Sequence, residues 1–325
     1  MVWQARYLPP DPVLWQGRAD MPNDACFYQH VELLNLLTTS AQKTAPTAFA
    51  LLGFRCDEGV QRDLGRSGAA EGSTAIRQYL GRLPIQNAAI QVFDAGNITC
   101  IDHDLEASQI ALAEIVKLLL AAEIHPIILG GGHELAFGHF QGIAQFVQKK
   151  SLGIINFDAH FDLQPLEHGE PGSAATTFYQ IAKYQETGTL VDLNCIGIQH
   201  SGNIRELFEQ AKRLGVKTIF ADDLHQRQIE KCVDFVDRVL DQNEGLYMSI
   251  SLDVFSPAYA PGVSMSQPLG LQPWDIIPYI RQAAASGKML SYDIVEHVPR
   301  YDIDHRTAKL AAALVYEIVH HHRDF

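Results

Sequence analysis

Short apolar runs alternate with amphipathic segments along almost the whole chain, and this alternation limits the folds open to it. Several runs, such as residues 47–54 and 152–157, are apolar on both faces, which is typical of parallel strands covered by helices on either side. The segments between them, such as residues 104–122, have apolar side chains at helical spacing. The predicted strands are residues 47–54, 90–95, 126–129, 152–157, 194–198, 218–221, 247–254 and 290–295. We therefore expect a three-layer α/β/α, doubly wound fold with a mostly parallel eight-stranded sheet.

The domain organisation is predicted to be simple. No linker, internal repeat or low-complexity block interrupts the pattern, so residues 1–325 are expected to form one domain. Residues 1–46 are less regular and are expected to wrap around that domain. Residues 204–214 and 307–322 have helical patterns, and the second is expected to be a terminal docking helix.

Charge and cysteine content exclude several classes of protein. The net charge of −13 argues against a nucleic-acid or anionic-membrane partner. The five cysteines are scattered without any CxxC pair, which argues against a disulfide framework or a zinc–thiolate site. We see no secretory signal at residues 1–10 and no apolar run long enough to span a bilayer. These observations predict a cytoplasmic protein.

Three ionisable residues follow one of the buried runs directly. Asp158, His160 and Asp162 come after residues 151–157, and strand alternation would send all three to the same side. Such groups repel one another unless a cation lies between them. Carboxylate and imidazole together are ligands for a hard or borderline divalent ion such as Mn²⁺.

Other predicted strands also end in polar residues. His133 follows the glycine turn 130–132, Asp253 ends the run from residue 247, and Glu296 ends the last run. Each alone is more simply explained as a turn former or helix cap. Because ligands of such sheets bind at the carboxyl ends of the strands, their occurrence at four strand ends favours a common site. The glycine turn lacks the Lys-Ser/Thr of a phosphate-binding loop, so we interpret it as the turn that delivers His133.

A run of three histidines, residues 320–322, lies near the end of the chain. Positive charge at a helix carboxyl end is favourable, so we interpret this run as a solvated helix end rather than a ligand cluster.

The sequence resembles the ureohydrolase (arginase/agmatinase) superfamily. Four stretches carry the resemblance in order and spacing: LGGGHE at residues 129–134, DAHFD at 158–162, SISLDVFSP at 249–257 and DIVE at 293–296. It runs from about Leu51 to the end of the sequence. The flanks are most similar to those of formimidoylglutamases: WQGR at 15–18, GFRCDEGV at 53–60, GRSGAAEG at 65–72, NFDAHFD at 156–162 and APGVS at 260–264.

The resemblance implies an arginase-like fold, two Mn²⁺ ions and hydrolysis of N-formimidoyl-L-glutamate to L-glutamate and formamide in histidine breakdown. It implies that His133 and Asp162 bind one ion, that His160 and Asp253 bind the other, and that Asp158 bridges the two. The ions would supply a hydroxide that attacks the C=N carbon. The resemblance also leads us to expect that the chain forms a homo-oligomer.

Catalytic roles are expected for two of these residues. Asp162 is the candidate to pass a proton to the departing amine, and Glu296 is the candidate to orient the amidinium. Arg62, Arg66 and Arg18 are candidates, by motif position only, to bind the substrate carboxylates. Residues 174–178 lack the proton-transfer histidine that arginases have there, which disfavours arginase or agmatinase activity.

One position departs from the superfamily pattern. Ser251 occupies the place of a bridging aspartate, and a hydroxyl is a far poorer metal ligand than a carboxylate. We therefore expect weaker metal retention, with one ion weakly held or absent. Two alternatives stay open: a different amidine or guanidine hydrolase, and a metal-poor relative that binds an acidic ligand without turnover.

Overall fold

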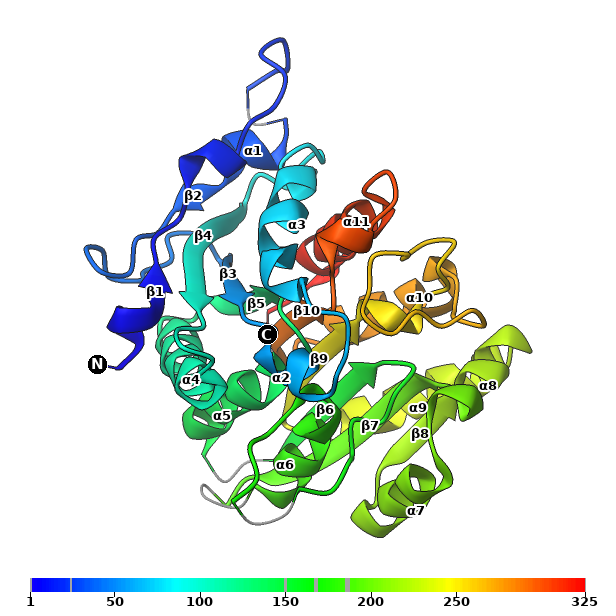
Figure 1. Ribbon diagram of the computed structural model, residues 1–325. Coiled ribbons are helices and arrows are strands. Elements are labelled where there is room, and N and C mark those ends of the chain that lie inside the picture. Colours follow the sequence, from blue (N-terminus) through cyan, green and yellow to red (C-terminus); the bar gives the residue numbers. More distant parts are fainter. Residues whose placement is uncertain (1, 24, 149–150, 167–168, 185–187, 325) are drawn as a thin grey trace.

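The computed structural model describes residues 2–23, 25–148, 151–166, 169–184 and 188–324 (Figure 1). The strands are β1 (Tyr7–Leu8), β2 (Glu32–Leu33), β3 (Thr47–Arg55), β4 (Ile90–Thr99), β5 (His125–Leu129), β6 (Ser151–Phe157), β7 (Leu190–Ile198), β8 (Lys217–Phe220), β9 (Gly245–Ser251) and β10 (Met289–Val295). The helices are α1 (Phe27–His30), α2 (Glu58–Arg62), α3 (Gly72–Leu80), α4 (Leu105–Ala121), α5 (Leu135–Val147), α6 (Thr177–Lys183), α7 (Arg205–Leu214), α8 (Ala221–His225), α9 (Ile229–Gln242), α10 (Pro273–Ala284) and α11 (Arg306–His321). Short 3₁₀ turns are η1 (Val2–Arg6), η2 (Pro12–Leu14), η3 (Ala69–Glu71), η4 (Ala174–Thr176), η5 (His200–Gly202), η6 (Leu252–Val254) and η7 (Pro299–Tyr301).

The described strands join one sheet of ten, in the order β1-β4-β3-β5-β10-β9-β6-β7-β8, with β2 also paired to β4. The eight strands from β3 to β10 are all parallel to one another. The predicted eight-stranded parallel sheet is thus confirmed, and the two short strands are additions at its β4 edge.

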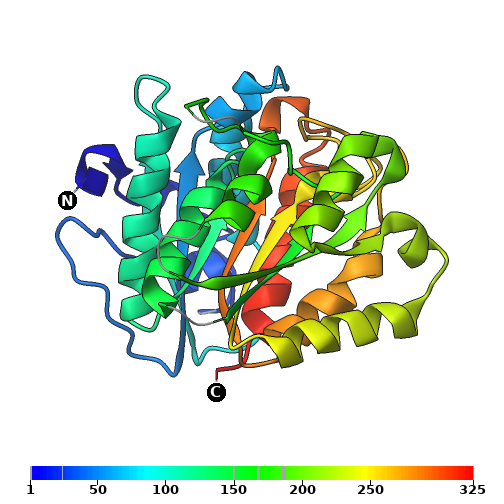
Figure 2. The same cartoon turned by 90° about the horizontal axis from the view of Figure 1, so that it is seen from below.

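Helices cover both faces of the sheet. Helices α4, α5 and α6 lie on one face, and α3, α11 and α10 lie on the other (Figures 1 and 2). Each face has its own apolar core, so neighbouring residues of one strand enter different cores: Phe49 and Leu51 face one, and Ala50 and Leu52 face the other. This explains why the strands are apolar on both faces. Within the described residues, no helix combines the length and apolar character that a bilayer span needs.

The N-terminal segment is held against the β4 edge. Strand β1 pairs antiparallel with β4 and β2 pairs parallel with it. The indole of Trp15 donates to Asp94 Oδ2 (2.8 Å), and Asp94 also binds the fully buried guanidinium of Arg77 on α3 at 3.0 Å. A hydrogen bond to a charged group contributes about 1.5–3 kcal/mol, so the Trp15 contact helps to hold the segment against the sheet. We propose that it belongs to the same single domain as the sheet.

Candidate metal centre

A glycine turn after β5 places His133 at the carboxyl end of the sheet. Gly130 and Gly131 have φ values of +71° and +80°, and a Cβ on Gly130 would lie 2.4 Å from the backbone nitrogen of Ser73. Only glycine fits there without displacing the chain. The backbone N–H of His133 then donates to Glu296 Oε1 at 2.8 Å, which ties this turn to the residue that follows β10.

Residues 158–162 converge with His133, but not through strand alternation. Strand β6 ends at Phe157, and the following residues form a turn in which the His160 N–H donates to Asp158 Oδ1 at 2.7 Å. Asp162 has φ +48°, a left-handed conformation that is costly for a non-glycine residue. Its carbonyl accepts from the N–H of Phe178 at 3.0 Å, so α6 holds it in place. These side chains do lie together, as predicted. The predicted cause, the two-residue period of a strand, was wrong.

The third strand end also differs from expectation. Strand β9 ends at Ser251, and Asp253 lies in the turn η6 rather than in the strand predicted over residues 247–254. The turn carries Asp253 to the imidazole of His160.

Five side chains form two groups that share one carboxylate. His133 Nδ1 lies 2.9 Å from Asp158 Oδ2 and 3.0 Å from Asp162 Oδ2. His160 Nδ1 lies 3.2 Å from Asp253 Oδ2 and 3.5 Å from Asp158 Oδ1. Within each group the ligand atoms lie within 4.8 Å of one another. The structure thus brings together the same five residues, in the same two sets around Asp158, that the resemblance implies.

The pKa values of these side chains show that both groups favour positive charge. Burial alone would lower the pKa of His133 and His160, but the adjacent carboxylates raise both well above the usual imidazole value. Burial would raise the pKa of Asp158, yet the two imidazoles hold it well below its usual range. Burial and the charge of Asp158 raise the pKa of Asp162 to about 6. In the chain without ions, protons on the imidazoles therefore balance the carboxylates.

These residues fit a pair of divalent ions. Among the described residues no aligned hydrogen-bond donor meets the buried Oδ2 of Asp158, although His133 Nδ1 faces it. An unsatisfied buried carboxylate oxygen is costly and is resolved by a cation. Imidazole nitrogen and carboxylate oxygen suit divalent first-row metals. The two groups therefore support a binuclear metal site.

The groups lie at the bottom of a cavity of about 450 Å³. His133, His160, Asp162, Asp253 and Glu296 all line it. Burial and the charge of Asp253 raise the pKa of Glu296 to about 8, and this residue too has a left-handed backbone, with φ +69°.

A buried network orients His133, and we did not anticipate it from the sequence. The hydroxyl of Ser249 donates to Asp293 Oδ1 at 2.6 Å, and Ser249 Oγ lies 2.9 Å from His133 Nε2. Since the hydroxyl proton points to the carboxylate, Oγ accepts from Nε2–H. Nδ1 is then the atom that faces Asp158 and Asp162 and that would bind an ion. Asp293 is fixed in turn by Tyr247 and by His139 Nδ1 at 2.8 Å. Ser249 and Asp293 belong to the stretches quoted above for the family resemblance, but only the fold shows that they meet.

We expect Ser249→Ala to weaken metal binding roughly 10- to 100-fold, because His133 loses the partner that fixes its ring. Metal titration of the chelator-treated protein measures this. Ser291→Ala is the matched control, because Ser291 is also buried on a strand and contacts a histidine, His139 Nε2 at 2.5 Å, outside both groups. Equal loss of metal affinity in the two variants would contradict the role given to Ser249.

Ser251 lies beside the second group. Its buried hydroxyl donates to Asp253 Oδ1 at 2.7 Å. The hydroxyl therefore orients Asp253, a candidate metal ligand, through the carboxylate oxygen that does not face His160. The expectation of weaker metal retention at this position stays a prediction.

The three candidate arginines have different surroundings. Arg62 lines the cavity, but its guanidinium already binds Glu58, Glu106 at 2.7 Å and the carbonyl of Gly172. Arg66 donates to the backbone carbonyls of residues 263 and 264 and stacks on a tyrosine ring, so it holds that loop. Arg18 lines a different pocket and binds Asp20 at 2.6 Å, so the structure does not bring it to the candidate centre. Motif position alone could not show these pairings.

Comparison with known proteins identifies the family. The family model described as "Arginase family" matches residues 47–321, most of the chain. The chain belongs to the arginase family. Among curated arginase-family relatives, the formimidoylglutamase of Legionella pneumophila (strain Lens) is 40% identical over 316 residues, covering 97% of this chain and 98% of that protein. The formimidoylglutamase of Clostridium tetani is 37% identical over 326 residues, covering 96% and 95%.

Solved structures show the same fold. The formimidoylglutamase of Bacillus subtilis superposes with a TM-score of 0.80 at 22% identity, over 94% of each chain. A formiminoglutamase of Trypanosoma cruzi crystallised with Mn²⁺ gives a TM-score of 0.76 at 22% identity, over 88% of this chain and 97% of that one. The predicted arginase-like α/β/α fold is therefore confirmed.

Proposed function

We propose that this arginase-family chain hydrolyses N-formimidoyl-L-glutamate to L-glutamate and formamide with two Mn²⁺ ions. The observation that carries the proposal is the pair of ligand groups around Asp158, in a chain that matches curated formimidoylglutamases over nearly its full length. The choice of Mn²⁺ is supported by the ligand types and by the Mn²⁺ in the Trypanosoma cruzi formiminoglutamase structure.

His133, Asp158 and Asp162 would hold one ion, and Asp158, His160 and Asp253 would hold the other. Bound divalent ions lower the pKa of a water molecule so that hydroxide is available near neutral pH. The chain itself supplies the ligands, keeps their imidazoles oriented and encloses the substrate in the cavity.

Two side chains are proposed to act on the substrate. Asp162 lines the cavity beside His133, and a carboxylate placed there can take up and release a proton. It would pass a proton to the departing amine. Glu296 also lines the cavity, and a cationic amidinium beside it would favour its ionised form and be oriented by it.

The cavity wall favours this substrate over arginine. Ala174 and Ala175 line it where arginases have their proton-transfer histidine, so that group is missing here. Arg62 is the candidate for a substrate carboxylate, because it lines the cavity. It would have to exchange part of its contact with Glu106, an exposed carboxylate and therefore a weak competitor.

A second function is favoured by Ser251. With a hydroxyl in place of a bridging carboxylate, the chain could be a metal-poor relative that binds a small acidic amidine without turnover. The neighbouring possibility, hydrolysis of another amidine or guanidine, keeps the same ligand groups and differs only in the cavity wall.

A substrate panel separates these functions. The purified protein is stripped with a chelator, reloaded with Mn²⁺, and supplied with formimidoylglutamate, arginine or agmatine. We expect Mn²⁺-dependent release of glutamate and formamide from the first compound alone. Binding of formimidoylglutamate without release of product would favour the non-catalytic relative. Turnover of arginine or agmatine instead would overturn the proposed substrate.

A further inference from the structure

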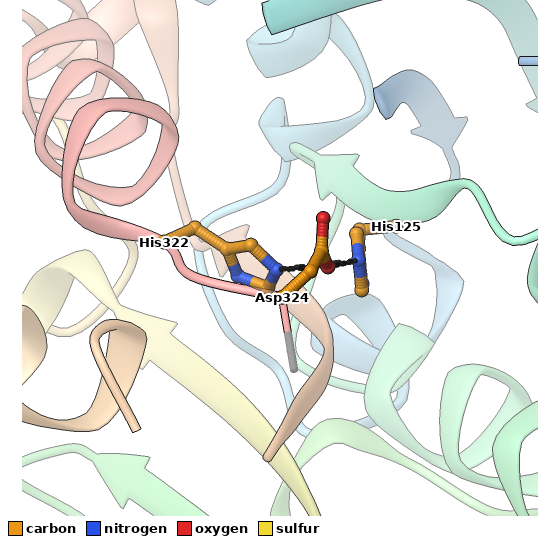
Figure 3. A group of neighbouring side chains, drawn as sticks. All are labelled: His125, His322 and Asp324. Atoms are coloured by element: carbon orange, nitrogen blue, oxygen red, sulfur yellow. Dashed lines mark hydrogen bonds and ion pairs between the residues drawn. The ribbon is translucent and has the colours of Figure 1, made fainter. Parts of the chain in front are cut away.

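A third group of ligand-type side chains lies at the opposite end of the sheet. His125 begins β5, while His322 and Asp324 follow α11 (Figure 3). Their ligand atoms lie within 4.8 Å of one another, and we call these three residues the tail cluster. Strand β5 runs from His125 toward the glycine turn that precedes His133, and its neighbours are parallel to it, so the two sites lie at opposite ends of the strands. The arrows of the parallel strands point the same way in Figure 2.

The sequence-based interpretation of the histidine run was wrong for one of its members. His322 is 3% exposed, so it is not part of a solvated helix end. His320 and His321 are partly exposed and bind carbonyls of their own helix. The chain turns after His321, where α11 ends, and this turn carries His322 inward. Helical periodicity could not show a turn of this kind.

The donor atoms of the tail cluster converge on one point. Asp324 Oδ1 lies 2.6 Å from His125 Nε2 and 3.1 Å from His322 Nε2, and the two Nε2 atoms are 3.2 Å apart. Ligands bound tetrahedrally at 2.0–2.1 Å from one ion stand roughly 3.3 Å apart. Two of the three distances are already close to that value. The third would need to open by roughly 0.7 Å, and the exposed side chain of Asp324 leaves room for such a movement.

The outward-facing atom of each ligand is also held. The Nδ1 of His125 lies 3.2 Å from the carbonyl of Leu290, which can only accept, so Nδ1 carries a proton and Nε2 is the atom that faces Asp324. His322 Nδ1 lies 2.8 Å from the hydroxyl of Tyr292. Contacts of this kind orient histidines in metal sites.

The carboxylate is oriented in the same way. Thr47 Oγ1 donates to Asp324 Oδ2 at 2.6 Å, which leaves Oδ1 for the convergence point. Each of the three side chains therefore presents one ligand atom to the same point. A neutral imidazole and an ionised carboxylate are the forms that bind metal.

We propose that His125, His322 and Asp324 form a metal site separate from the binuclear centre, suited to Zn²⁺. Two imidazoles, one carboxylate and a fourth position open to water are a typical zinc ligand set. This inference does not depend on the proposed activity. Its consequence is structural: an ion there joins the segment after α11 to the beginnings of β3, β5 and β10.

The competing arrangement is a clasp without metal. If His125 is an imidazolium, both Nε2–H groups can donate to Asp324 Oδ1, and the hydroxyl of Tyr292 can donate to His322. Two protons then take the place of one ion. The two arrangements differ in what added zinc does, and this makes them separable.

The test uses full-length protein in which the binuclear centre has been disabled by Asp158→Asn, so that zinc binding there does not mask the tail cluster. After chelator treatment, the protein is titrated with Zn²⁺ against a chromophoric competitor, and its thermal midpoint is measured with and without the ion. We expect the stripped Asp158→Asn protein to bind one Zn²⁺ per chain at the tail cluster. Its thermal midpoint should rise when the ion is added. Adding His125→Asn or Asp324→Asn should weaken this binding roughly 100-fold or more and abolish the rise, since each removes a ligand.

The matched control is His321→Asn, which changes the neighbouring histidine outside the cluster. It should leave the zinc stoichiometry unchanged. Asp324 and His321 are both partly exposed, so neither variant should prevent folding. Zinc stoichiometry that is the same with and without His125→Asn and Asp324→Asn would overturn the proposal. So would a parent protein, with His125 and Asp324 intact, whose midpoint does not respond to zinc although both substitutions lower that midpoint, because that is the behaviour of the clasp.

Discussion

The Asp158→Asn variant is expected to lose both ions and at least roughly 100-fold in turnover. Asp158 is the one side chain common to the two ligand groups, with Oδ2 toward His133 and Oδ1 toward His160. Asparagine has nearly the same shape but no charge, so both ions lose a carboxylate at once. Disturbing only a residue behind a ligand costs 10- to 100-fold, and loss of a shared ligand should cost more.

Elemental analysis after reloading with Mn²⁺, together with steady-state kinetics, measures the effect of Asp158→Asn. Asp192→Asn is the control, because Asp192 lies on the neighbouring strand β7 and pairs with Lys217, away from the ligand groups. We expect the control to keep its metal and its turnover. Two ions per chain in Asp158→Asn would refute the bridging role.

The Ser251→Asp variant is expected to bind Mn²⁺ roughly tenfold or more tightly than the natural chain. Ser251 is buried next to Asp253, so a carboxylate there adds a negative charge beside the second group. At an effective dielectric constant near 20, unit charges 4 Å apart interact by about 4 kcal/mol, of which 1.4 kcal/mol already gives a factor of ten.

The same substitution should have the opposite effect without metal. Added repulsion with Asp158 and Asp253 should lower the thermal midpoint of the stripped protein, and Mn²⁺ should then raise it by more than in the natural chain. Ser251→Asn is the control for size, since it adds the volume without the charge. If the natural chain already retains two ions tightly, or if Ser251→Asn matches Ser251→Asp, the serine does not limit metal binding.

Much of the fold was accessible from the sequence because the buried strands are continuous apolar runs. Strands β3 and β6 begin and end within one residue of the predicted bounds. The short strands β1 and β2 were not predicted, because two residues carry no periodic signal. Their position depends on pairing with β4, which is a property of the assembled sheet.

The candidate site was accessible only in part. Polar residues at strand ends indicated that His133, Asp158 and Asp253 lie together at the carboxyl ends of the strands, and the structure places them there. The geometry that joins them comes instead from turns, including the left-handed conformation of Asp162. Partners such as Ser249 and the inward position of His322 depend on contacts between distant segments, and no local pattern records those contacts.

The pairing of β1 and β2 with β4 also bears on aggregation. Without these two strands, the ten residues of β4 would leave backbone N–H and C=O groups unpaired along one border of the sheet. Such a border is a template on which another copy of the chain can add a strand. Strands β1 and β2 therefore limit intermolecular β-pairing at this border, quite apart from any chemistry at the carboxyl ends of the strands.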